Sequence, residues 1–496
     1  MTDATTLDRA PIAHPDRFFI GGDWVAPSSD STIDVITPST EELYVTVAEA
    51  QQSDVERAVA AAREAFDKGP WPRMSHAERA GYLREISKRL AARSADVSSI
   101  WTSEMGITSS LGGMMAGSVG GTYDYYASLA DSFAFEERHV PQGGGNVGLL
   151  VREPVGVVAA IIPWNGPILL IAVKIAPALL AGCTIVLKAS PEAPGAAYVM
   201  AEIMEEIGLP KGVFNVLTAD REVSELLVRH PDIDKVTFTG SSVAGKKIAS
   251  ICGERIARCT LELGGKSAAV ILDDYDLNAA AQSISGSARL FTGQVCSSLT
   301  RIVVSRNRHD ELLDAMASAF SAIRVGDPFD AAIDMGPLAM SRQRDRVEEY
   351  IAKGRAEGAT VATGGGRPAH LNRGFFVEPT VFGNVDNNMT IAREEIFGPV
   401  VSVIPADNEA QAVEIANDTV FGLNASVFTN DPDRAYQVAR ELRSGTVGHN
   451  SFRSDFSIAF GGFKQSGIGR EGGKEGLMPF LEAKTIILDA EPSHLR

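Results

Sequence analysis

The chain has 496 residues and a formal net charge of −17, from 46 Lys and Arg against 63 Asp and Glu. This acidic excess excludes a surface that binds nucleic acid or an anionic membrane by charge. Four cysteines without CxxC spacing and eight scattered histidines form no disulfide framework and no metal-ligand motif, so we expect a cytoplasmic protein without a bound metal.

The first ten residues contain two Asp and no apolar stretch. They predict a frayed tail and not a secretory signal. The most apolar segment, residues 155–187, is interrupted by prolines and by Asn165 and Lys174. Because a membrane span needs about 20 apolar residues in succession, this segment is expected in the buried core.

The N-terminal part predicts a hairpin followed by helices. Residues 18–25 (FFIGGDWV) have β-prone runs around two glycines. Amphipathic spacing predicts a helix that begins with a cap at Ser53–Asp54, a second helix over 75–90, and a third helical stretch that ends near Asp131. Residues 136–154 contain a Gly triplet and an extended run, so they are expected to leave the domain.

From residue 155 short β-branched runs alternate with amphipathic helices, which is typical of βαβ units and a parallel sheet. Such sheets bind ligands at the carboxyl ends of their strands. The turns at 163–165, 188–190 and 239–241 follow three of these strands and are expected to share one edge. Strands are predicted at 156–162, 184–190, 213–218 and 235–240, and helices from Ile168 and over 193–207, 221–230 and 242–252.

A second α/β series follows residue 274, and two such series predict two α/β domains with a cleft between them. The tail at 481–490 (LEAKTIILDA) has the alternation of a strand, which would pair with the 136–154 excursion or with another subunit. The predicted elements are a helix from Leu277 into the Cys296 loop, strands at 301–305 and 401–406, helices over 309–323 and 341–358, an extended run at 375–383, and a last strand-helix-strand set that reaches Val447.

One thiol lies in a small-residue setting. Cys296 follows Gly293 and precedes Ser297 and Ser298, which leaves room for a substrate carbon within bonding distance. Taken alone, the segment fits a buried structural cysteine as well. Glu262, between apolar neighbours and ahead of two glycines, indicates a buried acid, and it is the candidate base that raises the thiolate fraction of Cys296.

Two glycine-rich stretches have spacings that suggest phosphate binding. Residues 467–472 match GxGxxG but no strand precedes them and too little chain follows for a βαβ unit, so they are excluded as a dinucleotide fingerprint. Residues 240–247 follow a strand and open a helix, yet Lys247 stands where a phosphate loop has the Ser or Thr that holds magnesium. A helix N-terminus that receives a pyrophosphate fits better than a P-loop hydrolase or simple packing.

Taken together, the motifs resemble the aldehyde dehydrogenase superfamily in order and spacing, from the FIGGDWV hairpin to the LEAKTI tail. They are PWNGP (163–167), KASPE (188–192), FTGSSVAG (238–245), LELGGKS (261–267), FTGQVC (291–296), EEIFGPV (394–400) and FGGFKQSGIGRE (460–471).

The resemblance implies an α/β fold with a Rossmann-like cofactor domain at 1–131 and 153–264, an α/β catalytic domain at 265–464, and a small β oligomerisation element at 132–152 and 477–496. It implies aldehyde oxidation to a carboxylic acid with hydride transfer to NAD(P)+, in a homodimer or homotetramer. The nucleophile matches Cys296, the general base Glu262 and the oxyanion donor Asn165. The implied cofactor contacts are Ile161, Pro163, Trp164, Lys188, Ser190, Thr239, Gly240, Ser241, Gly245, Leu263, Glu395 and Phe397.

The chemistry requires these residue types for its own reasons. Thiol attack on an aldehyde gives a hemithioacetal whose oxygen develops charge, and the Asn165 amide with the Cys296 backbone N–H would stabilise it. The thioester left after hydride departure needs a carboxylate to activate water, a contribution of about 10²- to 10⁴-fold. A chain without Glu262 would more readily transfer its acyl group to coenzyme A.

The adenosine side departs from the family pattern. Many members have a Glu that binds both ribose hydroxyls three residues after the lysine of the second turn. Here that position is Pro191, and Glu192 follows it. NAD is expected, and this departure keeps NADP as the alternative.

The substrate side departs from the pattern as well. Gly166 stands where many relatives have a bulky aromatic residue, and Val173 follows on the same helix, so we expect a wide tunnel and an apolar or aromatic aldehyde. Phe452 and Phe456 are expected to line it, and His449 to act as a second base or as a polar residue at its mouth. A catalytically silent binding protein is the alternative function, which the intact catalytic residues disfavour.

Overall fold

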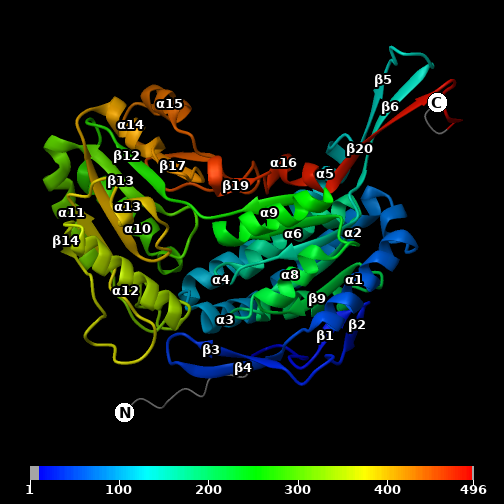
Figure 1. The fold of residues 1–496 in the computed structure, drawn as a ribbon, viewed down its shortest axis with the longest axis horizontal. Coiled ribbons are helices and arrows are strands. Elements are labelled where there is room, and N and C mark those ends of the chain that lie inside the picture. Colours follow the sequence, from blue (N-terminus) through cyan, green and yellow to red (C-terminus); the bar gives the residue numbers. More distant parts are fainter. Residues whose placement is uncertain (1–9, 494–496) are drawn as a thin grey trace.

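The structure is a computed structural model that describes residues 10–493, so the expected tail at 1–9 lies outside the described residues. Its strands form an eight-stranded sheet, a seven-stranded sheet, a three-stranded sheet and a two-stranded ribbon. Figure 1 shows the two large sheets with their helices as separate lobes, and the three-stranded sheet as an arm that projects from the first lobe. The predicted α/β fold class is confirmed.

The eight-stranded sheet has the order β19-β11-β10-β7-β8-β9-β1-β2. The strands from β11 to β9 are parallel, whereas β1 and β19 pair antiparallel with β9 and β11. The predicted hairpin is present as β1 and β2. The strands are β1 (Phe18–Ile20), β2 (Asp23–Val25), β7 (Val157–Ile161), β8 (Thr184–Ala189), β9 (Phe214–Thr218), β10 (Lys235–Thr239), β11 (Arg258–Glu262) and β19 (Gly467–Ile468).

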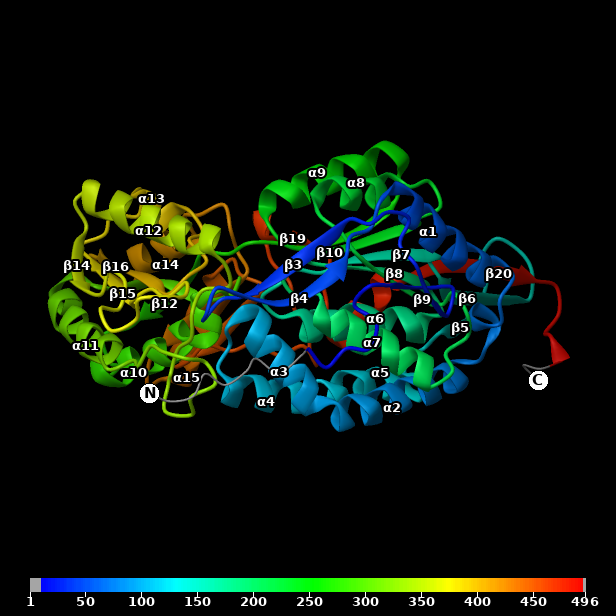
Figure 2. The ribbon, with the colours of Figure 1, turned by 90° about the horizontal axis from the view of Figure 1, so that it is seen from below.

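Helices cover both faces of this sheet (Figure 2). Alternate residues of β7 face opposite ways, so Val157 packs with the cluster under α1, α8 and α9, and Val158 packs with the cluster under α6 and α7. A strand buried on both faces has to be apolar throughout, as β7 is. The helices are α1 (Gln52–Asp67), α6 (Pro167–Ala181), α7 (Gly195–Glu206), α8 (Arg221–Arg229) and α9 (Ser242–Arg255).

Two details of the N-terminal helices differ from prediction. The cap of α1 is Gln51 rather than Ser53–Asp54, because the buried Asp54 carboxylate accepts a hydrogen bond from the Gln51 backbone N–H over 2.9 Å. The third helical stretch is broken at Gly106, which has a φ of 81° and packs where a Cβ would lie 2.7 Å from Pro337. The helices here are α2 (His76–Ala92), α3 (Ser94–Met105), α4 (Ser109–Ser118) and α5 (Gly120–Ser132).

The seven-stranded sheet has the order β14-β15-β16-β13-β12-β17-β18, and every pair except β14 with β15 is parallel. The chain passes from the first large sheet to the second across residues 263–266. The elements of this second lobe are β12 (Ser267–Ile271), α10 (Leu277–Ala288), β13 (Leu299–Ser305), α11 (His309–Ser321), α12 (Ser341–Ala356), β14 (Thr360–Thr363), β15 (Thr380–Gly383), α13 (Thr390–Arg393), β16 (Val400–Ala406), α14 (Glu409–Asn417), β17 (Asn424–Phe428), α15 (Pro432–Glu441) and β18 (Thr446–His449).

The arm consists of β5 (Glu136–His139), β6 (Val147–Pro154) and β20 (Leu481–Leu488), in the order β20-β6-β5. The tail strand thus pairs with the excursion, from Leu481 opposite Pro154 to Leu488 opposite Val147. The short helix α16 (Gly473–Leu477) precedes β20, and an unpredicted ribbon of β3 (Thr32–Thr37) and β4 (Glu42–Ala48) lies under the first lobe. Within residues 10–493, none of the helices has the length and apolarity that a membrane crossing requires.

Candidate active site

Cys296 lies in the loop between a short 3₁₀ turn at Leu290–Gly293 and β13, and it is half-buried. Phe291, Thr292 and Gly293 all have positive φ, so the loop before the thiol is tightly coiled. A Cβ on Gly293 would lie 2.2 Å from the Gly398 carbonyl carbon. Gly293 therefore lets the loop pack against its neighbour.

Asn165, in the turn after β7, is tied to this loop. Its Nδ2 donates to the Gln294 carbonyl oxygen over 2.9 Å, and its own carbonyl oxygen accepts from Trp101 Nε1 over 3.1 Å. Gln294 is fully buried, and its side chain in turn accepts from the Ala339 N–H over 3.0 Å. Asn165 is thus held beside the cysteine loop from both sides.

Glu262, the last residue of β11, is 2 % exposed, and neither carboxylate oxygen has a hydrogen-bond partner among residues 10–493. Burial, and then the nearby carboxyl of Glu471, raises the pKa of Glu262 well above its usual value, against the opposing charges of Lys174 and Arg470. Because its environment disfavours the ionised form, the Glu262 carboxylate binds a proton more tightly than an exposed one, which is the property of a general base.

The thiol itself is protonated at neutral pH in this arrangement. Burial, and then the carboxyls of Glu395 and Glu262, raise the pKa of Cys296 to about 12. The two carboxyls are therefore close enough to act on the thiol electrostatically. Attack by Cys296 requires a proton acceptor or an added positive charge.

Glu395 and Phe397 reach the same region from the loop that precedes β16. Glu395 Oε1 accepts from the Gly265 N–H over 3.0 Å, and burial raises the pKa of Glu395 to about 7 despite that hydrogen bond. Phe397 has a φ of 63°, and its ring lies edge-on to Trp164 with centroids 5.5 Å apart. Trp164 belongs to the first lobe, so this contact joins the two lobes.

The predicted cofactor residues of the first lobe share one sheet edge. Ile161 pairs with Phe238 on one side and with Lys188 on the other, so the turns after β7, β8 and β10 lie next to one another. Burial lowers the pKa of Lys188 to about 8, although Glu192 and Asp220 oppose the shift, and its Nζ donates to the Ala219 carbonyl oxygen over 3.4 Å. The residues brought to this edge are Ile161, Pro163, Trp164, Lys188, Ser190, Thr239, Gly240 and Ser241.

The N-terminus of α9 forms part of the edge and fits an anion. Ser241 caps the helix by accepting from the Ala244 N–H over 3.3 Å, while Thr239 Oγ1 and Ser242 Oγ are buried without a protein partner. Gly245 packs on Leu263, whose Cδ2 would lie 2.4 Å from an added Cβ. Free donors at a helix N-terminus suit a pyrophosphate, so the edge fits the dinucleotide that the sequence resemblance implies.

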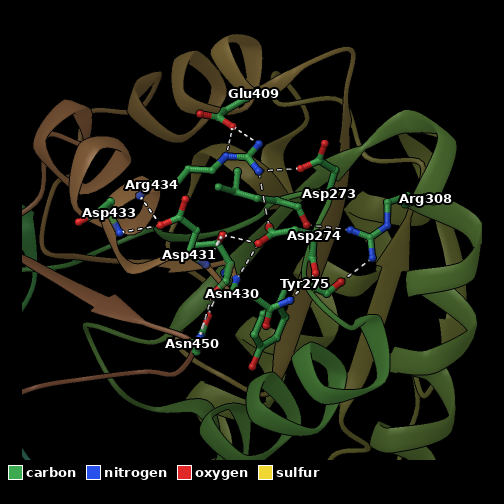
Figure 3. A network of polar contacts seen from close by, with 12 residues as sticks. Asp273, Asp274, Tyr275, Arg308, Glu409, Asn430, Asp431, Asp433, Arg434 and Asn450 are labelled. Carbon is green, nitrogen blue, oxygen red and sulfur yellow. Dashed lines mark hydrogen bonds and ion pairs between the residues drawn. The ribbon is translucent and has the colours of Figure 1, made fainter.

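His449 and the two phenylalanines have packing and hydrogen-bond partners in the second lobe. His449 is exposed, and its Nε2 lies 3.0 Å from the Thr429 carbonyl oxygen. It belongs to a structural network at the carboxyl ends of β12 and β17, in which Asp274 binds Thr429 and Asn430 (Figure 3). The Phe452 side chain packs on the core under α10 and α11, and Phe456 lies 4.5 Å from Phe460.

Three apolar side chains lie next to Gly166, and the sequence alone did not indicate them. A Cβ on Gly166 would lie 3.9 Å from Phe291 and 4.0 Å from both Leu170 and Trp101, which is ordinary contact. Trp101 comes from α3, far away in sequence, and no local pattern marks it. Lys174 was visible as a charge in an apolar helix, and the structure pairs it with Glu471 in a fully buried ion pair next to Glu262.

Comparison with known proteins gives matches to a single family of enzymes. The model of the aldehyde dehydrogenase family matches residues 24–486. A geranial dehydrogenase of Castellaniella defragrans is 44% identical over 95% of this chain and 98% of its own. A crystal structure of a Mycobacterium tuberculosis aldehyde dehydrogenase complexed with NAD+ has a TM-score of 0.93, with 46% identity over 95% of this chain and 98% of that one. A mutant aldehyde dehydrogenase C of Pseudomonas syringae, complexed with NAD+ and octanal, has a TM-score of 0.93 and 39% identity over 97% and 99% of the two chains.

Proposed function

The chain belongs to the aldehyde dehydrogenase family, as its motifs indicated, and on that premise we propose how its residues oxidise an aldehyde to a carboxylic acid with NAD+. The observation that carries the assignment is the meeting of Asn165, Glu262 and Cys296, from three separate elements, at the junction of the two lobes.

Cys296 is the proposed nucleophile. Because its thiol is protonated at neutral pH, its proton has to pass to water as sulfur attacks the aldehyde carbon. The hemithioacetal oxygen that results accepts hydrogen bonds from Asn165 Nδ2 and from the Cys296 backbone N–H. The structure supports this role for Asn165, whose amide is already fixed against the cysteine loop.

Glu262 is the proposed base for the second half of the reaction. With both oxygens free of protein partners, it can hold a water molecule and take its proton as that water attacks the thioester on Cys296. The buried Lys174–Glu471 pair lies beside it and supplies the charges that set its proton affinity. This base is what favours hydrolysis over transfer of the acyl group to another thiol.

The sheet edge of the first lobe is the proposed site of NAD+, which relatives of solved structure hold. The pyrophosphate would lie at Thr239, Gly240, Ser241 and the N-terminus of α9, the adenosine ribose at Lys188, and the nicotinamide ribose at Glu395 beside Phe397. When bound, the oxidised nicotinamide ring supplies positive charge near the thiol and accepts the hydride. The remaining proposed contacts are Ile161, Pro163, Trp164, Ser190, Gly245 and Leu263.

The proposed substrate is an apolar aldehyde of medium length. Gly166, the buried Val173 and the wall of Phe291, Leu170 and Trp101 give an apolar surface next to Asn165. One relative is named for geranial and another is complexed with octanal, both apolar aldehydes. Each buried methylene contributes about 0.8 kcal/mol, so a few carbons raise kcat/KM about tenfold or more if the surface holds them.

The assembly and domain assignments are proposals of the same kind. We assign the cofactor domain to 1–131 and 153–264, the catalytic domain to 265–464, and an oligomerisation element to 132–152 and 477–496, supported by the partition of the sheets. The arm presents the edge strand β20 to a second copy, which suits a homodimer or homotetramer. The four cysteines of the chain are free thiols, which suits a cytoplasmic location.

The test of this function is NADH formation that depends on added aldehyde. The purified chain is expected to reduce NAD+ with octanal or geranial and to release the matching acid. Absence of NADH formation across a panel of aldehydes with either NAD+ or NADP+ would instead support the alternative of a catalytically silent family member.

A further inference from the structure

The turn between β8 and α7 lacks a carboxylate at the position where one is expected. Pro191 stands there, and its side chain cannot accept hydrogen bonds from ribose hydroxyls. Lys188, at the start of the same turn, is buried and directed to the Ala219 carbonyl oxygen. An acceptor for the adenosine ribose must therefore come from another residue of this edge.

Glu192, the next residue of the turn, is the candidate for that acceptor. Its side chain is 22 % exposed, Ser190 Oγ donates to its Oε2, and Arg342 donates to its Oε1. Burial alone would raise the pKa of Glu192, but the hydrogen bonds from Ser190 and Arg342 hold it below its usual value, so the carboxylate is charged at neutral pH. An ionised carboxylate has about four lone-pair sites, which leaves two for a ligand.

Arg342 comes from the other lobe. It is in the first turn of α12, where the helix dipole disfavours a cation, and its side chain is 61 % exposed. Its pairing with Glu192 therefore compensates an unfavourable placement and crosses from the second lobe to the ribose turn of the first. Breaking the pair would release both a carboxylate and a guanidinium at the same place.

We propose that the Glu192–Arg342 pair selects the dinucleotide at its adenosine ribose. Glu192 accepts the ribose hydroxyls of NAD+, and Arg342 is a positioning residue that orients the carboxylate. The phosphate on the 2′ oxygen of NADP+ would meet that carboxylate and be repelled, whereas an Arg freed from it would bind the phosphate. This rests on the proposed function, because it assumes that the dinucleotide lies along this sheet edge.

The experiment measures the dissociation constants of NADH and NADPH by fluorescence titration, without aldehyde, for the wild type and three variants. Glu192→Gln is expected to shift the NADPH-to-NADH ratio toward NADPH by about tenfold or more, the size of one lost charge-assisted bond. Arg342→Met is expected to raise the dissociation constant of NADH severalfold. The double variant is expected to show a smaller NADPH gain than Glu192→Gln, because the repulsion by Glu192 is still relieved but the released guanidinium is gone.

Steady-state kinetics separate positioning from a structural role. Changes are expected in KM for the dinucleotide, with kcat at saturating NAD+ within about twofold, and thermal unfolding checks that each variant is folded. The matched control is Glu222→Gln, an exposed carboxyl in the first turn of α8 at the same sheet edge. Equal shifts in the control and in Glu192→Gln would overturn the proposal, because the effect would then be one of net charge.

An unchanged ratio in Glu192→Gln, or a wild type that binds NADPH as tightly as NADH, would also overturn it. If Arg342→Met does not fold, Arg342→Lys replaces it, and loss of NADH affinity there still reports the planar guanidinium geometry that Lys cannot supply. Because the titrations need no turnover, a wild type that binds NADH but oxidises no aldehyde would refute the proposed function and leave this inference standing.

Discussion

Asn165 Nδ2 lies 2.9 Å from the Gln294 carbonyl oxygen, so a side chain of the first lobe is hydrogen-bonded to the loop of the second lobe that carries Cys296. One amide hydrogen is used in this bond, and the other is free for an oxygen at the thiol. The relative position of the two lobes and the geometry of the oxyanion donor are therefore set by the same contact.

Replacement of Asn165 by Ala is expected to lower kcat/KM for the aldehyde by about 10²- to 10³-fold, because one oxyanion donor is lost. The dissociation constant of NADH should change little. Trp101→Phe is the matched control, since it removes the hydrogen bond to the Asn165 carbonyl oxygen and keeps the amide. If both variants lose the same activity, Asn165 acts by placing its turn and not as a donor.

The pH dependence of thiol reactivity follows from the pKa of Cys296, which burial, Glu395 and Glu262 raise to about 12. Because only the thiolate reacts, alkylation of the Cys296 peptide by iodoacetamide should rise steadily from pH 7 toward pH 10. Glu262→Gln removes a negative charge that opposes the thiolate, so its profile should lie at lower pH. Mass spectrometry has to resolve the peptides, because the half-exposed Cys259 also reacts. A profile that moves to higher pH would show that Glu262 promotes ionisation.

The substrate preference depends on Gly166. Gly166→Phe would place a ring against Phe291 and Trp101, so kcat/KM for octanal should fall about tenfold more than that for propanal. Gly166→Ala is the control, because its Cβ meets its neighbours at ordinary contact distance and should change the preference little. A wild type that favours acetaldehyde or a charged semialdehyde over octanal and benzaldehyde would contradict an apolar pocket.

The arm should hold subunits together. Light scattering is expected to give two or four times the monomer mass at micromolar concentration. Ile487→Lys, on the exposed edge strand β20, should weaken the assembly, whereas Leu43→Lys, equally exposed on β4 outside the arm, should not. A wild-type monomer would contradict the role assigned to the arm.

Local patterns predicted the parts of the fold that depend on periodicity. The alternation after residue 155 placed the strands β7, β8 and β10 and so their shared edge, because parallel strands end on the same side. The break at Gly106 was missed because it is required by Pro337, a contact more than two hundred residues away in sequence.

The residue types of the candidate site could be predicted from the sequence, but the charges and partners around them could not. Glu262 between apolar residues indicated burial, and the structure places it at 2 % exposure. The charge of Glu471 that acts on it comes from a segment about two hundred residues further along the chain, so the residues next to Glu262 do not indicate it.

The most direct test of the account is a rapid-quench experiment on Glu262→Gln with NAD+ and octanal, analysed by mass spectrometry of the Cys296 peptide. The account predicts a burst of NADH close to one per subunit, slow turnover afterwards, and an octanoyl adduct on Cys296 that accumulates with the burst and is absent in Cys296→Ala. NADH formation by Cys296→Ala at a rate near that of the wild type, or an adduct on another residue, would contradict it.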